Sequence, residues 1–463
     1  MRRSKRAAGG TARLRDLLAL ALCAAPLAAS AETLSSALAR AYMGNPTLDA
    51  QRASVRAVDE NVPRALSGYR PSVTALGNVG FNRVEGTLQG QSVNRATLPA
   101  SVGLQINQNL FNGFRTENST RAAESQVFGS REGLRNVEQN ILFTGAQAYM
   151  NVLRDTAILN LQRNNVEVLE EQLSQTRTRF EVGEVTRTDV AQSESRLAAA
   201  RSQVSAAESN LQTSIATYRQ IIGVEPRQLA QGVPVDRHVP RTVTAAVQIG
   251  LEEHPAIHSA MHAVDAAELQ VKITEGELAP TVGLTGSLAQ GYNQNVQNDS
   301  ALSASVVAQV TIPIYQGGEV FARVRQAKET AGQRRIEAEA ARDQVRAAVI
   351  SAWGSLDAAK ASVRAAQAQV QAANVALLGV REESRVGQRT TLDILNQQQE
   401  LLNARVNLIV SQRDRVVASY AVVQAIGRLS ARTLGLNVAL YSAKLHFDQV
   451  KDLPWGLRTP DGR

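Results

Sequence analysis

The chain has 463 residues, of which 44% are apolar and only 4% are aromatic, and its single cysteine is Cys23. Small apolar residues in place of bulky ones favour closely packed helices over an ordinary globular core, and one cysteine excludes an internal disulfide framework. The formal net charge of +8 does not indicate nucleic-acid binding, because the basic residues alternate with Glu and Gln on helices and form no patch with stacking aromatics.

The N-terminal segment is typical of a secretory signal sequence. Six basic residues, the last of them Arg15, precede an apolar run at 17–27 and the small residues Ala29-Ser30-Ala31. The run is about half of the roughly 20 residues that a spanning helix needs, which favours a cleaved signal over a membrane anchor. We predict a signal peptide at 1–31. Its six basic residues and Asp16 account for +5, so the mature chain keeps +3 and no cysteine.

The mature chain contains an internal duplication of about 200 residues. Asn45-Pro46 matches His254-Pro255 at an offset of 209, whereas Ile222-Gly223 matches Ile426-Gly427 at an offset of 204. The change of offset indicates that one copy has a longer loop. The predicted units are a first repeat at 32–223, a linker at 224–241, a second repeat at 242–427 and a C-terminal tail at 428–463 that is partly disordered.

Each repeat begins with a helical segment, at about 34–66 and 243–277. Apolar and polar residues then alternate, and a period of two is typical of β-strands with one apolar face. The alternating stretches lie at 73–81, 98–110, 282–288 and 302–312. Between them, segments 85–95 and 293–300 are rich in Gly, Asn, Gln and Ser, and we predict that both are hairpin loops.

The strands have two possible settings, a half-buried hairpin on a soluble domain or a membrane. Each is near the 9 to 11 residues of a tilted membrane strand, and its polar face is small and uncharged. No stretch of the mature chain has 18 uninterrupted apolar residues, so insertion into a membrane would have to use strands. Because about eight strands are the practical minimum for a barrel, four would require several chains to share one.

The longest helices follow the strands. Large apolar residues recur every seven positions from Val152 to Phe180 and from Val190 to Tyr218, with small residues three positions after those of the second series. A sustained heptad pattern of this kind predicts a coiled coil. The register breaks near Gly183, which predicts a turn and an antiparallel helical hairpin, and the second repeat has the same pattern around Gly387.

The two predicted turns share a motif in which a Val-Gly pair is followed by Thr and, six residues after the Gly, by Asp. The acids are Asp189 and Asp393. Their simplest role is to complement the positive end of a new helix, which contributes about 0.3–1 kcal/mol. A functional role depends on what the hairpin tips do.

No other motif indicates chemistry. His254, His258 and His262 are spaced to share one helix face, but no carboxylate or cysteine accompanies them. Because His254 precedes Pro255, we also predict that it lies before the helix proper. A surface or packing role is therefore favoured over metal binding. No nucleophile with its base, no phosphate-binding loop and no carboxylate pair in a pocket is evident, so we expect no cofactor and no enzymatic activity.

Three motifs in this order resemble the TolC-like outer-membrane efflux proteins over nearly the whole mature chain. They are Leu110-Phe111-Asn112-Gly113, the first turn from Val182-Gly183 to Thr188-Asp189, and the second from Val386-Gly387 to Asp393. The resemblance implies a mainly α fold with β, internally duplicated. Four transmembrane strands per chain would contribute to a trimeric β-barrel in the outer membrane, continued by a long antiparallel α-helical coiled-coil barrel in the periplasm.

The resemblance also implies a function and partners. The homotrimer would be a passive exit duct for type I protein secretion or multidrug efflux. It would work with a periplasmic adaptor protein and an inner-membrane ABC or RND-type transporter. The run from Val182 to Val190 is slightly nearer to the secretion branch, and the substrate stays open. The alternative from another class is a periplasmic coiled-coil adaptor or a surface fibre, which would not account for the four strands.

The resemblance also assigns functional roles to the residues of this sequence that match the functional positions of the family. The periplasmic gate would comprise Thr188, Asp189, Arg389, Ser384, Gln172 and Arg381. The resemblance implies that Arg389 is the basic residue that pairs with Thr188 and Asp189. The pore constriction would comprise Asp393 and Asn396, and the adaptor contacts at the tips Val182, Gly183, Val386 and Gly387. Three positions depart from the family pattern: Asn396 replaces an acid of the constriction, Ser384 an aromatic of the gate, and Arg381 an acidic partner of Gln172. The gate should therefore be less negative than is usual in the family.

Overall fold

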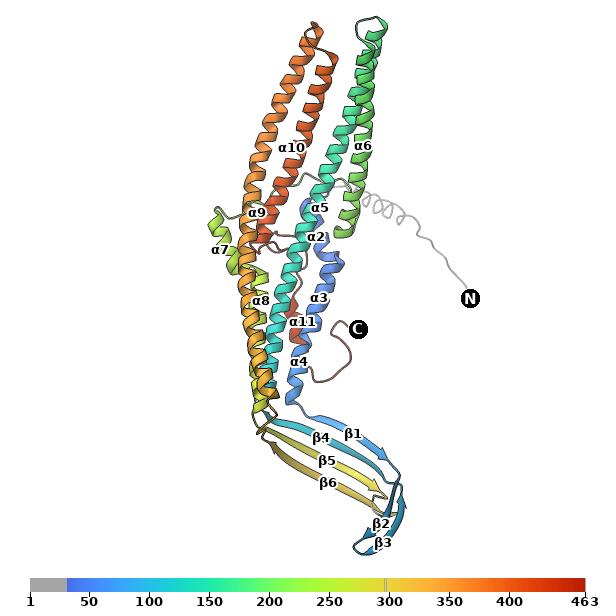
Figure 1. Cartoon of the computed structure of the whole chain (residues 1–463), viewed down its shortest axis with the longest axis vertical. Helices are drawn as coiled ribbons and strands as arrows, with labels where there is room; N and C mark the ends of the chain where they lie inside the picture. Colours follow the sequence, from blue (N-terminus) through green and yellow to red (C-terminus); the bar gives the residue numbers. More distant parts are fainter. Residues whose placement is uncertain (1–30, 295, 297, 463) are drawn as a thin grey trace, which may run out of the picture.

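The computed structural model describes residues 31–294, 296 and 298–462. It is an elongated molecule, with helical hairpins at one end and a small sheet at the other (Figure 1). The predicted signal peptide, with Cys23, lies outside the described residues except for its last position. Among the residues described, no helix combines the length and apolar character needed to cross a membrane.

The helices repeat in order, as the duplication predicts. The shorter ones lie along the lower half of the helical part (Figure 1). In the first repeat these are α2 (Leu34–Gly44), α3 (Pro46–Asp59) and α4 (Asn61–Leu66), and in the second α7 (Val243–Glu253) and α8 (Pro255–Glu275).

The matched Asn45-Pro46 and His254-Pro255 pairs are the same helix-starting device. Asn45 caps α3, its Oδ1 accepting the N–H of Thr47 at 2.9 Å. His254 caps α8, its Nδ1 accepting the N–H of Ala256 at 3.2 Å. In both helices proline occupies the first turn, where its missing N–H costs nothing. The prediction that His254 lies before the helix proper is confirmed. No group of residues suited to hold a metal ion occurs in the part of the chain that the structure describes.

The two longest helices run the whole length of the helical part, and each forms a hairpin with a shorter helix at the upper end (Figure 1). The hairpins are α5 (Arg115–Glu181) with α6 (Arg187–Ile222), and α9 (Glu319–Arg385) with α10 (Thr391–Ala425). The heptad series face the cores of the hairpins: Leu159, Leu197 and Leu377 are all less than 10% exposed. Phe180, in the last turn of α5, is an exception at 44% exposed.

The main sheet has the strand order β1-β4-β5-β6, all antiparallel. Its strands are β1 (Ser72–Val79), β4 (Ala100–Asn112), β5 (Thr281–Tyr292) and β6 (Ser300–Thr311). The duplication therefore places one strand pair from each repeat side by side, and β4 joins β5 at the centre. The predicted four strands of this sheet are confirmed.

The two faces of the sheet differ as the alternation predicts. On one face Val102, Leu104 and Ile106 are 59%, 51% and 47% exposed in the single chain. On the other face the hydroxyl of Thr285 donates to Oδ1 of Asn107 across β4 and β5, at 3.2 Å. The single chain therefore leaves an apolar face uncovered.

Segment 85–95, predicted as a loop, is instead part of a second hairpin. It pairs β2 (Asn82–Leu88) with β3 (Gln91–Thr97), apart from the main sheet. The connection is the two-residue turn Gln89-Gly90, with φ of 51° and 78°. Positive φ at both positions matches the right-handed twist of a tight hairpin. The prediction was wrong because polar composition outweighed the signal of a turn glycine.

The tail contains a helix, α11 (Ala443–Val450), that the pattern did not predict. It docks on α3 through the buried Asp59, whose Oδ2 is 3.0 Å from Nδ1 of His446. Arg131 of α5 approaches the same carboxylate at 3.8 Å. Burial raises the pKa of Asp59, and the contacts with His446 and Arg131 oppose that rise. The tail is thus held on the first repeat by a buried polar cluster.

Candidate gate at the hairpin tips

Both tips have the same local structure. Gly183 and Gly387 follow α5 and α9 with φ of 80° and 78°, a left-handed conformation that glycine adopts without a steric penalty. Thr186 and Thr390 then cap α6 and α10 in capping boxes. The predicted helix-to-helix turns are confirmed.

The acids Asp189 and Asp393 complete these caps. Oδ2 of Asp393 accepts the N–H and the hydroxyl of Thr390, both at 2.9 Å, and Asp189 does the same with Thr186. The hydrogen bonds from Thr390 lower the pKa of Asp393, and the charge of Arg389 lowers it further. Asp393 is therefore an ionised, partly exposed carboxylate at neutral pH, with Oδ1 outside the capping box.

Arg389 is bonded within its own hairpin. Its Nε donates to Oε2 of Glu383 at 2.8 Å, which raises the pKa of the guanidinium. Within the described residues of a single chain, no hydrogen bond or ion pair joins it to Thr188 or Asp189. Its two terminal amino groups also have no hydrogen-bond partner there. A latch between Arg389 and Thr188 or Asp189 would thus need a second chain or a change of rotamer.

Gln172, Arg381 and Ser384 are brought together. They line a cleft of about 690 Å³ between α5 and α9, beside Glu167 and Glu171. Gln172 belongs to the first hairpin, and Arg381 and Ser384 to the second. The structure thus joins half of the predicted gate positions and leaves Thr188, Asp189 and Arg389 apart.

Asn396, the expected replacement for a constriction acid, contacts the other hairpin. Its Oδ1 accepts a hydrogen bond from Nη2 of Arg196 on α6, at 2.9 Å. Sequence reasoning missed Arg196. No local signal marks an arginine whose partner lies 200 residues away.

The outermost apolar residues of the tips are Val182 and Val386, which are 68% and 71% exposed. Each precedes the turn glycine, Gly183 or Gly387. Two apolar side chains at the end of a polar coil suit contact with a partner.

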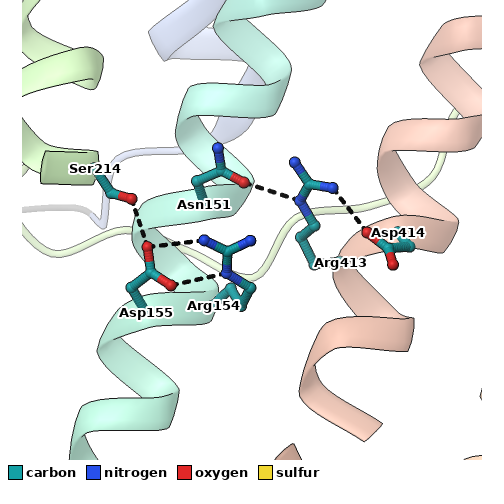
Figure 2. A network of polar contacts seen from close by, with 6 residues as sticks. All are labelled: Asn151, Arg154, Asp155, Ser214, Arg413 and Asp414. Carbon is teal, nitrogen blue, oxygen red and sulfur yellow. Dashed lines mark hydrogen bonds and ion pairs between the residues drawn. The ribbon is translucent and has the colours of Figure 1, made fainter. Parts of the chain in front are cut away.

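Farther from the tips, a polar network crosses the helices (Figure 2). The carboxylate of Asp155 on α5 is buried. It accepts one hydrogen bond from the hydroxyl of Ser214 on α6 and two from the guanidinium of Arg154. Arg413 of α10 donates to Asn151 of α5 at 2.9 Å and to Asp414 at 2.7 Å. The network ties α5 to both α6 and α10.

Comparison with known proteins gives concordant results. The family model described as outer membrane efflux protein matches residues 34–224 and 246–428. The chain is 45% identical to the outer membrane efflux protein BepC of Brucella suis biovar 1, covering 94% of each chain. It is 27% identical to the outer membrane protein TolC of Escherichia coli K12, over 92% of this chain and 88% of that protein. The fold resembles the Campylobacter jejuni CmeC outer membrane channel, with a TM-score of 0.78, 16% identity, and 90% and 89% of the two chains covered.

Proposed function

This chain belongs to the outer membrane efflux protein family, and from that premise we propose that three copies assemble into one channel-tunnel. The family comprises channels of the outer membrane, and the chain is a passive exit duct for efflux or type I secretion. We propose no catalytic role and no cofactor.

One observation supports the proposed assembly of three chains. The four-stranded sheet has free edges at β1 and β6 and an apolar face that is about half exposed. Three such sheets would pair at their edges into one closed barrel of about twelve strands, with the apolar face toward lipid. A periplasmic adaptor or a surface fibre has no use for such a face. Heat-modifiable trimers in outer-membrane fractions and discrete channels in planar bilayers are the expected results. Full solubility without detergent would contradict the proposal.

The helical hairpins would then form a periplasmic tunnel whose tips receive the partners. Energy for transport would come from an inner-membrane ABC or RND-type transporter, reached through an adaptor protein. The adaptor would contact Val182, Gly183, Val386 and Gly387. Opening would be a two-state shift of the coils around Gln172, Arg381 and Ser384.

The cargo is proposed to be small molecules. The relative at 45% identity is named an efflux protein, and this outweighs the slight likeness of the first turn to the secretion branch. Deletion of the gene should increase susceptibility to toxic compounds without loss of a secreted protein. The reverse outcome would assign the duct to protein secretion.

Asp393→Ala should weaken cation selectivity and block by divalent cations. In a trimer, three partly exposed carboxylates would face one another, and such a ring favours cations. Reversal potentials in a salt gradient measure the first effect, and added divalent cations test the second. Retention of both properties would remove Asp393 from the pore, and a small loss of stability alone would leave it only the capping role.

Arg389→Ser should raise single-channel conductance. Glu383 occupies only Nε of the guanidinium, so the terminal amino groups could bond Thr188 or Asp189 of a neighbouring chain and hold the closed tip. Recordings in planar bilayers check this. A conductance equal to that of the wild type would show that Arg389 is no latch.

A further inference from the structure

The two hairpins are joined by hydrogen bonds between side chains at three levels along α10. Within the described residues these are Arg196 to Asn396 near the tip, Arg413 to Asn151 midway, and Gln424 to Asn140 at the base. The tip half of the molecule therefore has a single such bond between hairpins. Any motion that separates the tips has to break this bond as well as the apolar contacts between the hairpins.

The contact follows from how α10 packs. Leu395, which is 2% exposed, is buried with Leu197 of α6 in a cluster that spans the two hairpins. Asn396 and Arg196 are their immediate neighbours in the chain. The buried leucines set the rotation of α10, and that rotation brings the amide of Asn396 to the guanidinium.

The surroundings of Arg196 offer its guanidinium no acidic partner in the described part of the chain. Among the described residues it forms no ion pair, and its bond is to a neutral amide. The adjoining cleft, of about 570 Å³, is lined by amide and aliphatic side chains, such as Gln203 and Asn403, and by no acid. Asn396 is three residues after Asp393, or about one helical turn along α10.

We propose that Arg196 is a further gate residue, which latches the two hairpins through Asn396 and sets a positive charge beside the Asp393 constriction. This inference rests on the proposed trimeric channel. In the trimer, three Arg196 charges would oppose three Asp393 charges. The pore would then select cations weakly and admit anionic cargo more readily than a pore with two acidic rings.

The latch is the weak point between the hairpins, because both of its side chains are accessible to water. The midway contact is different, since Arg413 and Asn151 adjoin the buried Asp155 and its partners (Figure 2). The contact between Arg413 and Asn151 would therefore act as the pivot when the tips separate. A typical intramolecular hydrogen bond shifts an equilibrium by roughly 3- to 10-fold, and the bond between Arg196 and Asn396 is exposed.

The test is a double-mutant cycle in planar bilayers with the full-length protein. Arg196→Gln and Asn396→Ala should each raise the open probability by roughly 3- to 10-fold, and the double variant should do no more than either alone. Asn396→Asp should lower it, because an ion pair replaces a bond to a neutral amide. Arg201→Gln is the matched control: Arg201 is also on α6 but pairs with Glu170 of its own hairpin, and the variant should behave as the wild type.

Measurements of cation selectivity distinguish the effect of the Arg196 charge from the effect of its hydrogen bond to Asn396. Arg196→Gln should increase the preference for cations, whereas Asn396→Ala should leave it unchanged. If the wild-type protein forms no channel, the proposed function fails. If it forms channels, but Arg196→Gln and Asn396→Ala leave their open probability at the wild-type value or act additively, the latch is wrong. Unaltered selectivity in Arg196→Gln would place its charge outside the pore.

Discussion

Replacement of Gly427 by alanine should lower the free energy of unfolding by about 2–4 kcal/mol, through strain and a backbone clash together. Gly427 follows α10 with φ of 81°, where a side chain is disfavoured. An added Cβ would lie 2.7 Å from Cα of His254, which is backbone and cannot rotate away. The carbonyl of Gly427 also accepts a buried hydrogen bond from Gln139, so the turn cannot shift without cost.

The duplication supplies the control. Gly223 ends α6 at the equivalent position, with φ of 88°, but an added Cβ there would meet no atom within 4 Å. Gly223→Ala should therefore cost only the strain, about 1–2 kcal/mol. Denaturant unfolding in detergent measures both. Equal losses for the two variants would show that the contact with His254 adds nothing.

Replacement of Asp155 by alanine should lower the free energy of unfolding by about 2–4 kcal/mol. The carboxylate is buried and accepts three hydrogen bonds, one from Ser214 and two from Arg154. Its loss leaves the buried hydroxyl of Ser214 and the half-buried guanidinium of Arg154 without their acceptor (Figure 2). Thermal or denaturant unfolding of the purified protein checks the value.

Asp414 belongs to the same network and is the matched control. Its side chain is 47% exposed and bonds Arg413 through one oxygen. Exposed ion pairs contribute about 0–1 kcal/mol, so Asp414→Ala should have a small effect. If it destabilises the protein as much as Asp155→Ala, burial is not what gives Asp155 its importance.

Much of the fold is predictable from the sequence because its signals are local. The seven-residue spacing around Leu159 and Leu197 depends only on the helical repeat, and the alternation at Val102, Leu104 and Ile106 only on the pleat of a strand. The duplication adds a second, independent copy of each signal. Segment 85–95 was mistaken because a tight turn and a loop have similar composition.

At the hairpin tips, too, the sequence predicts a contact where both partners lie close together in the chain. Asp189 and Asp393 lie three residues after the threonines that they bond, so their caps are encoded locally. The partner of Asn396 is not, because Arg196 lies 200 residues away in the sequence. Arg389 is bonded to Glu383 of its own hairpin, although the family resemblance pointed to Thr188 and Asp189.

The sequence by itself thus determined the hairpins, the strands with their apolar face, the two capped turns and the family. Only the tertiary structure decided which helix faces meet. Arg196 reaches Asn396 because Leu395 is buried beside Leu197 and so sets the rotation of α10. That rotation arises from the packing of segments about 200 residues apart. The seven-residue pattern of either segment alone does not predict it.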